Sequence, residues 1–201
     1  MLRLALAGPH TQILSTVCAR CPHSAAGCCQ GPPPMDWSDV GRIVALGGRD
    51  WLLEQIAAKH LVPDARGLAI AKAKGLSRPG GPKVLKCVFH GPTGCTVPPE
   101  RRSATCNYYV CESVLDAPEA KGEAARAREA KDALARRFEA WDEGLAREVV
   151  ERYPEGVVWD AALLDWLGGR FRELSSDASP APRAPRRART ARRPASPSDR
   201  P

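Results

Sequence analysis

The stretch Cys18-Ala19-Arg20-Cys21-Pro22-His23-Ser24-Ala25-Ala26-Gly27-Cys28-Cys29 decides how this chain of 201 residues is organised. A second group of cysteines stands at positions 87, 95, 106 and 111, and the rest of the chain has none. Each group supplies four thiols, which is the ligand number of a tetrahedral zinc site or of one iron–sulfur cluster. The sequence therefore predicts a metal-binding protein whose ligands are Cys18, Cys21, Cys28, Cys29, Cys87, Cys95, Cys106 and Cys111.

Two other uses of cysteine fit this sequence less well. Disulfide frameworks belong mainly to small secreted proteins, and the apolar stretch within residues 1–10 is too short for a secretory signal. We therefore expect a cytoplasmic protein with reduced thiols. A thioredoxin-like redox pair at Cys18 and Cys21 needs a strand before it and a helix after it, yet Pro22 follows directly and no apolar strand is predicted before Cys18. No apolar run is long enough to span a membrane, so no membrane partner is expected.

The composition divides the chain into three regions. Residues 1–117 are interpreted as a cysteine-cluster metal-binding domain, residues 118–176 as a helical extension, and residues 177–201 as a disordered basic tail of Pro, Arg and Ala. Much of the net charge of +7 lies in the tail, which has seven Arg, two Asp and almost no large apolar residue. Such a segment cannot bury enough surface to offset the entropy of ordering. Its arginines suit weak contact with nucleic acid or an acidic protein.

The residue pattern predicts a mainly α fold: a small cysteine-rich domain with short helices and a β-hairpin, followed by an α-helical hairpin and the disordered tail. Two short helices are expected between residue 36 and residue 57, with Gly47-Gly48 between them. Residues 83–89 and 95–97 are expected to pair as a hairpin that brings Cys87 close to Cys95. Apolar residues at spacings of three and four predict a long helix over residues 118–152 and a last helix from about Trp159, packed as an antiparallel pair against each other or against the metal domain.

The order of the cysteines is C-x2-C-x6-CC, then C-x7-C-x10-C-x4-C, with a Ser-Asp-Val-Gly-Arg-Ile helix start between the groups. This order resembles the YkgJ-type cysteine-cluster family, whose members are described as zinc- or iron-chelating proteins and sometimes as iron–sulfur oxidoreductases. Lys86-Cys87-Val88-Phe89 is similar to the family's Cys-x-Phe, and Gly94-Cys95-Thr96-Val97 to its Gly-Cys-x-Ile. Over residues 18 to 111, the resemblance implies a metal-ligand role for all eight cysteines.

The predicted function is zinc or iron binding, with iron–sulfur cluster binding included, by eight thiolates in one or two sites. Thiolate donors exclude magnesium and calcium but do not separate zinc from an iron–sulfur cluster. The alternatives are an iron–sulfur oxidoreductase or protein-modifying enzyme, and an adaptor that binds acidic partners through its tail. No Gly-rich phosphate loop, Ser-His-Asp set or His-Glu-x-x-His motif is present, so no catalytic residue is predicted.

Neighbours of the cysteines suggest three further expectations. Adjacent side chains in an extended backbone point to opposite sides, so Cys28 and Cys29 are predicted to serve different sites or to divide into one ligand and one free thiol. Positive charge favours thiolates, which gives Arg20, Lys86, Arg101 and Arg102 a role in lowering nearby thiol pKa values. His23 and His90 are candidates to replace a thiolate, as in mixed zinc sites.

Overall fold

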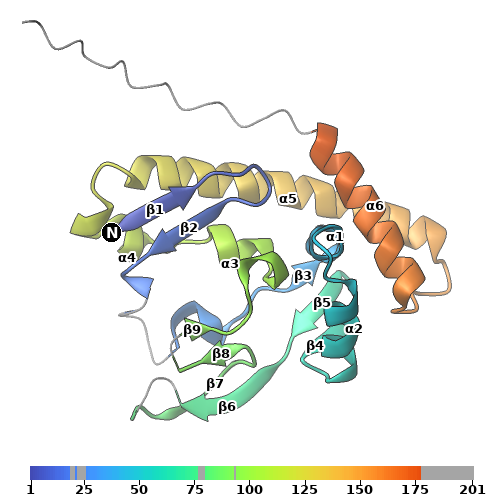
Figure 1. Ribbon diagram of the computed structural model, residues 1–201, viewed down its shortest axis with the longest axis horizontal. Coiled ribbons are helices and arrows are strands. Elements are labelled where there is room, and N and C mark those ends of the chain that lie inside the picture. Colours follow the sequence, from blue (N-terminus) through green and yellow to red (C-terminus); the bar gives the residue numbers. More distant parts are fainter. Residues whose placement is uncertain (19–20, 22–25, 77–79, 93, 178–201) are drawn as a thin grey trace, which may run out of the picture.

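The computed structural model describes residues 1–18, 21, 26–76, 80–92 and 94–177 (Figure 1). The described residues are about 52% helix and about 19% strand. The strands form several small sheets, so the fold is mixed α/β and the predicted mainly α class is wrong. The predicted tail lies outside the described residues except for Asp177, which ends the last helix.

Helices form where the apolar stripes are long. The predicted short helices and the two long ones are present, although the first long helix starts at residue 124 instead of residue 118 and the second starts only at residue 161. The α-helices are α1 (Trp37–Ala45), α2 (Arg49–Ala57), α3 (Ala104–Tyr108), α4 (Glu112–Leu115), α5 (Ala124–Arg152) and α6 (Ala161–Asp177). Single 3-10 turns are η2 (Gly27–Gln30), η3 (Pro99–Arg101) and η4 (Pro118–Ala120). Within the described residues, no helix is both long enough and apolar enough to cross a membrane.

The strands are short and pair antiparallel in four separate sheets. Strands β1 (Leu2–Ala5) and β2 (Gln12–Ser15) form the first sheet, and β3 (Met35–Asp36), β5 (Gly67–Ile70) and β4 (Leu61–Asp64) form the second in that order. The other sheets are β6 (Lys72–Leu76) with β7 (Lys83–Cys87), and β8 (His90–Gly91) with β9 (Gly94–Cys95). A strand therefore does precede Cys18, contrary to the prediction from sequence.

The prediction paired residues 83–89 with residues 95–97, but the structure pairs each of these segments with another strand. β7 pairs with β6, which precedes it in sequence, while β9 pairs with the two residues of β8. Residues 72–76 are Lys-Ala-Lys-Gly-Leu and lack the apolar alternation that marks a half-buried strand, so β6 could not be recognised from the sequence. Four-residue strands such as β1 offer too few repeats for alternation to be recognised.

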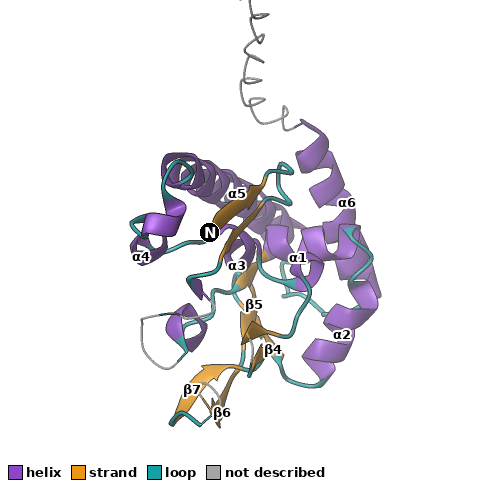
Figure 2. Cartoon of the chain, turned by 60° about the vertical axis from the view of Figure 1, so that its left-hand side comes forward, coloured by secondary structure: helices purple, strands orange, loops and turns teal. Residues whose placement is uncertain are grey.

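Helix α1 is the centre of the larger hydrophobic cluster. It packs against α6 and α5 and against β3 and β5, and Val40 and Ile43 are fully buried there. Two glycines allow the close approach of α1 and α6, because a Cβ on Gly41 would stand 2.6 Å from the Leu167 carbonyl oxygen and one on Gly168 would stand 2.6 Å from a Val44 methyl carbon. Figure 2 shows α1, α2 and α6 on one side of the molecule.

The helices after residue 118 share both hydrophobic clusters with the part of the chain before it. Leu145 and Leu164 belong to the cluster around α1, while Phe138 and Phe171 join β1, β2, α3 and α4 in the second cluster. Of the two packings predicted for the long helices, the structure has mainly the one against residues 1–117, because α6 packs most extensively on α1. It is tied to α5 by the ion pair of Arg170 with Glu148. In Figure 1, α6 crosses α5 near the C-terminal end of α5.

Two buried carboxylates fix the starts of helices in other parts of the chain. Asp142 on α5 accepts a hydrogen bond from the Ser38 backbone N–H at 2.7 Å, and Asp39 on α1 accepts one from the Ala104 backbone N–H at 2.6 Å. Each N–H lies in the first turn of a helix, where it has no partner within the helix and a negative charge is favourable. The first bond joins α5 to α1, and the second joins α1 to α3.

Candidate metal centre

The eight cysteines lie on short helices, short strands and turns that the fold brings to one side of the molecule. Cys18 follows β2, Cys28 and Cys29 are in η2, Cys87 ends β7 and Cys95 ends β9. Cys106 lies within α3, and Cys111 caps the start of α4. β7 lies beside η2, and Figure 1 shows β7, β8 and β9 grouped below α3. The two sequence groups are thus joined in one region, as their predicted common role requires.

Cys18 has three thiols as electrostatic neighbours. The pKa of Cys18 is raised by desolvation and then by the negative charges of Cys28, Cys111 and Cys21. Cys111 belongs to the second group in sequence, yet it lies near a thiol of the first group. One set of interacting thiols therefore consists of Cys18, Cys21, Cys28 and Cys111.

The other thiols form a second interacting set. Cys29 is influenced by the charges of Cys87 and Cys106, and Cys87 by that of Cys95. Desolvation, the charge of Asp39 and the charges of nearby thiols raise the pKa of Cys106 to about 12, although its side chain reaches the surface. The second set consists of Cys29, Cys87, Cys95 and Cys106.

Cys28 and Cys29 connect the two sets. Their thiols are hydrogen-bonded to each other, which lowers the pKa of Cys28 and raises that of Cys29. The interaction of Cys28 with Cys106 is a further link across the sets. The spatial sets differ from the sequence groups in two residues. Cys111 joins the first set, and Cys29 joins the second.

Gly27 allows a cysteine sulfur to lie against the backbone. Its φ of +52° is in the left-handed region, and a Cβ at this position would stand 2.7 Å from the Sγ of Cys21. Any side chain here would both strain the backbone and displace that sulfur. Gly94, with φ of +120°, is the first residue of β9 and directly precedes Cys95.

The lysine and arginine side chains near the cysteines form hydrogen bonds mainly with groups other than the thiols. Lys86 donates to the Leu76 carbonyl at 2.6 Å, and its Nζ lies 2.9 Å from the Nδ1 of His90. Burial raises the pKa of Cys87, and the charge of Lys86 lowers that pKa only slightly. Arg101 donates to the carbonyls of Leu46 and Gly47, and the Arg102 Nε donates to the Val97 carbonyl. Arg20 and His23 lie outside the described residues.

The donor set fits a soft metal in its chemistry, while the sulfurs stand too far apart to form a finished site. Within residues 1–18, 21, 26–76, 80–92 and 94–177, no three Cys, His, Asp or Glu side chains converge closely enough to hold an ion. Closing either four-thiol set around a metal requires cysteine rotation and adjustment of the short turns that carry it. Thiolates repel one another, and a bound cation offsets that repulsion.

A polar cavity that sequence reasoning missed lies next to the second set. Its volume is about 270 Å³, and it is lined mainly by Asp36, Asp39, Arg66, Tyr108, Glu139 and Asp142. Burial raises the pKa of Asp142 to about 7, and the charges of Asp39 and Asp36 add to this effect. Asp39 lies within the Ser-Asp-Val-Gly-Arg-Ile segment, where the sequence indicated only a helix start. The sequence of the long helix did not indicate that Asp142 would be buried.

Comparisons of the chain with models of protein families, with curated proteins and with solved structures find no significant match. The resemblance to the YkgJ-type cysteine-cluster family therefore stays a prediction based on the eight cysteines and the short motifs around them. The two interacting thiol sets are the strongest guide to function.

Proposed function

We propose that this protein binds zinc or iron, the latter as an iron–sulfur cluster or as single ions, through eight cysteine thiolates in two four-thiolate sites. Cys18, Cys21, Cys28 and Cys111 would hold one metal centre. Cys29, Cys87, Cys95 and Cys106 would hold the other. The single observation that carries the proposal is that thiols of the two sequence groups lie near one another in the fold, since Cys18 is influenced by Cys111, and Cys29 by Cys87 and Cys106. Eight thiols are enough for two centres of four ligands each, which is the ligand number that zinc and iron–sulfur centres require.

The protein around the thiols supports this proposal. The cysteines draw on β7, β9, η2, α3 and α4, which lie far apart in sequence, so a metal in either site would join separate parts of the fold. β8 and β9 have only two residues each, and such short pairs are marginal without another constraint. Bound zinc would supply that constraint, whereas an iron–sulfur cluster would supply electron transfer as well.

Purification without oxygen, followed by metal and sulfide analysis and an absorption spectrum, tests the proposal. Zinc in a colourless protein would identify structural centres. Iron with sulfide and a band near roughly 400 nm would identify clusters. A preparation with neither metal, whose eight thiols all react with iodoacetamide under native conditions, would overturn the proposal. Refolding the same chain in the presence of zinc or ferrous salts controls for metal lost during purification.

A further inference from the structure

The hairpin of β6 and β7 carries a concentration of positive charge that the overall composition conceals. Between residue 65 and residue 99 the sequence has six Lys and Arg and no Asp or Glu. Three of these, Lys72, Lys74 and Lys83, are exposed on the two strands. None of the ion pairs among the described residues involves them. Their charges are therefore available to a partner.

The register places these lysines on one face of the hairpin. Lys74 is paired with Leu85, Leu76 with Lys83, and Lys72 with Cys87. Residues directly opposite each other in an antiparallel pair, and residues two apart along a strand, share a face. The face thus presents Lys72, Lys74, Lys83, Leu76 and Leu85, while Cys87, which ends β7 on the same face, is buried. Leu76 is 49% exposed and Leu85 is 53% exposed.

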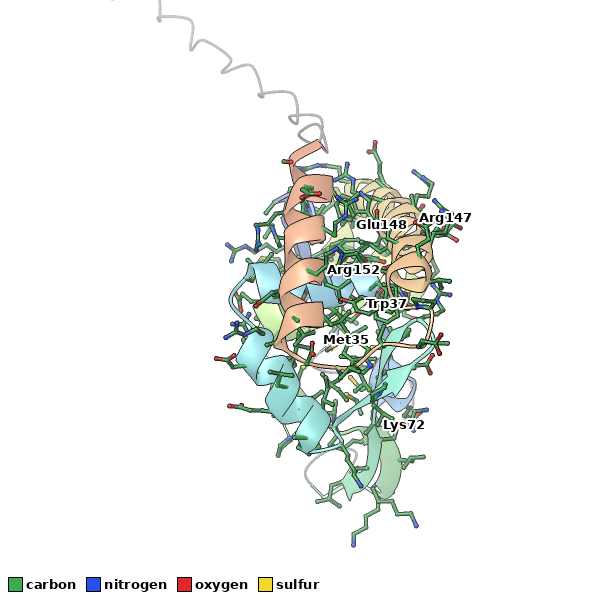
Figure 3. All side chains as sticks on the ribbon, turned by 90° about the vertical axis from the view of Figure 1, so that its right-hand side faces the viewer. Met35, Trp37, Lys72, Arg147, Glu148 and Arg152 are labelled. Atoms are coloured by element: carbon green, nitrogen blue, oxygen red, sulfur yellow. The ribbon has the colours of Figure 1, made fainter. Side chains whose placement is uncertain are left out.

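The opposite face of the hairpin is turned toward the rest of the protein. Lys86, buried on that face, lies over Gly75, where a Cβ would stand 3.0 Å from its Cε, and contacts the ring of His90 in β8. Apart from the buried Cys87, the lysine face is therefore the one directed to solvent. Figure 1 shows the hairpin extending away from α1, α5 and α6, and Figure 3 places Lys72 at that end of the molecule.

We propose that the exposed face of the β6–β7 hairpin binds the phosphate backbone of duplex DNA without sequence preference. The major groove of B-form DNA admits a two-stranded β-ribbon. Lys72 and Lys74 are two strand residues apart, or about 6.8 Å, which matches the rise of two phosphates along one DNA strand. The face has no aromatic residue for stacking on the bases of single strands.

An anionic membrane is the less suitable partner for this face. Peripheral membrane binding segregates apolar side chains on one face from basic side chains on the other. Here the two leucines stand among the lysines on the same face, so neither can enter the acyl region without carrying a charge along. Phosphate groups of a duplex can instead meet the lysines directly, while the leucines contact sugar or thymine methyl groups.

The test measures binding of the full-length, metal-loaded chain to a labelled duplex of mixed sequence by fluorescence anisotropy between 50 and 200 mM NaCl. The variant Lys72→Gln, Lys74→Gln, Lys83→Gln removes three charges from the face. The matched control Lys121→Gln, Arg136→Gln, Arg147→Gln removes three exposed charges elsewhere. The 178–201 segment with its seven arginines is the same in all proteins, so its contribution cancels.

We expect the hairpin variant to reduce the slope of log K against log salt by about 2–3, because each phosphate contact contributes about 0.9. The control should change the slope by less than about 1. The corresponding Lys→Arg variant should bind like the unsubstituted chain, because it keeps the charges. An equal reduction of the salt slope in the hairpin and control variants, or a loss of DNA binding in the Lys→Arg variant, would overturn the proposal.

Two further measurements separate this proposal from other outcomes. Metal content must be unchanged in the hairpin variant, so that failure of DNA binding and failure of the metal proposal are distinguished. Vesicles that contain phosphatidylserine are the competing probe. Lysine-dependent binding to the vesicles without lysine-dependent binding to the duplex would overturn the assignment to DNA.

Discussion

The helical side of the molecule and the cysteine-bearing side are stabilised by different means. On the helical side, Val40, Leu52 and Leu164 are fully buried in one continuous cluster. On the other side, short strands, one 3-10 turn and the short helices α3 and α4 carry thiols of which five are exposed and only Cys87 is buried. The first region is held by apolar burial, whereas no residue of η2, β8 or β9 belongs to either hydrophobic cluster. The comparison teaches that the second region needs a further constraint, which the proposed metal centres would provide.

Removal of metal should have the largest effect and should separate the two regions. Binding at a structural zinc site contributes on the order of 10 kcal/mol in small domains. After chelation, we expect the amides of η2, β7, β8 and β9 to lose protection from hydrogen–deuterium exchange, while α1 and α6 retain theirs. If the chelated protein has unchanged melting temperature and exchange, the metal role is wrong.

Truncation of a buried leucine should weaken the helical side strongly. Leu164→Ala removes a side chain that is fully buried and should reduce the free energy of unfolding by about 2–5 kcal/mol. The matched change Leu85→Ala, at a side chain 53% exposed on the other side, should cost less than about 0.5 kcal/mol. Urea unfolding of both metal-loaded variants checks this. Similar losses would mean that the two regions are not stabilised differently.

Neutralising Asp142 should flatten the dependence of stability on pH. Burial raises the pKa of Asp142 to about 7 in the folded protein, above the ordinary value in the unfolded chain. The folded state therefore binds more protons between about pH 4 and pH 7, and this carboxyl costs stability as the pH rises through that range. Asn can still accept the bond from the Ser38 N–H. We expect Asp142→Asn to reduce the loss of unfolding free energy between pH 5 and pH 8 by about 2–3 kcal/mol.

Urea unfolding at several pH values measures this difference. The control is Glu143→Gln, an exposed carboxylate on the same helix, which should leave the slope unchanged. An Asp142→Asn protein with the same slope as the unsubstituted chain would show that Asp142 is ionised in the folded state without cost.

Removal of residues 178–201 should have the smallest effect. The segment has seven Arg and no large apolar residue, so its loss should change the free energy of unfolding by less than about 0.5 kcal/mol. Metal content per chain should not change. Loss of metal in the shortened protein would show that the tail contributes to the metal region.

Sequence reasoning succeeded where a pattern extends over several helical turns. The apolar stripes of α5 and α6 were recognised because they repeat along whole helices. β1 and β6 were missed because strands of four or five residues show too few repeats, and β6 carries Lys where alternation would need apolar residues. The placement of Cys111 beside Cys18 also could not be predicted from the sequence. It depends on how α4 packs on α5 and not on the spacing of the cysteines along the chain.

The central claim is that Cys28 and Cys29 serve two different four-thiolate sites. Native mass spectrometry of the full chain and of Cys28→Ser and Cys29→Ser, combined with mapping of alkylated thiols, tests it most directly. The account predicts two metal centres in the unsubstituted chain and one in each variant. Cys18, Cys21 and Cys111 should become reactive in Cys28→Ser, and Cys87, Cys95 and Cys106 in Cys29→Ser. A single centre in the unsubstituted chain, or one variant that exposes all remaining thiols while the other exposes none, would contradict the account.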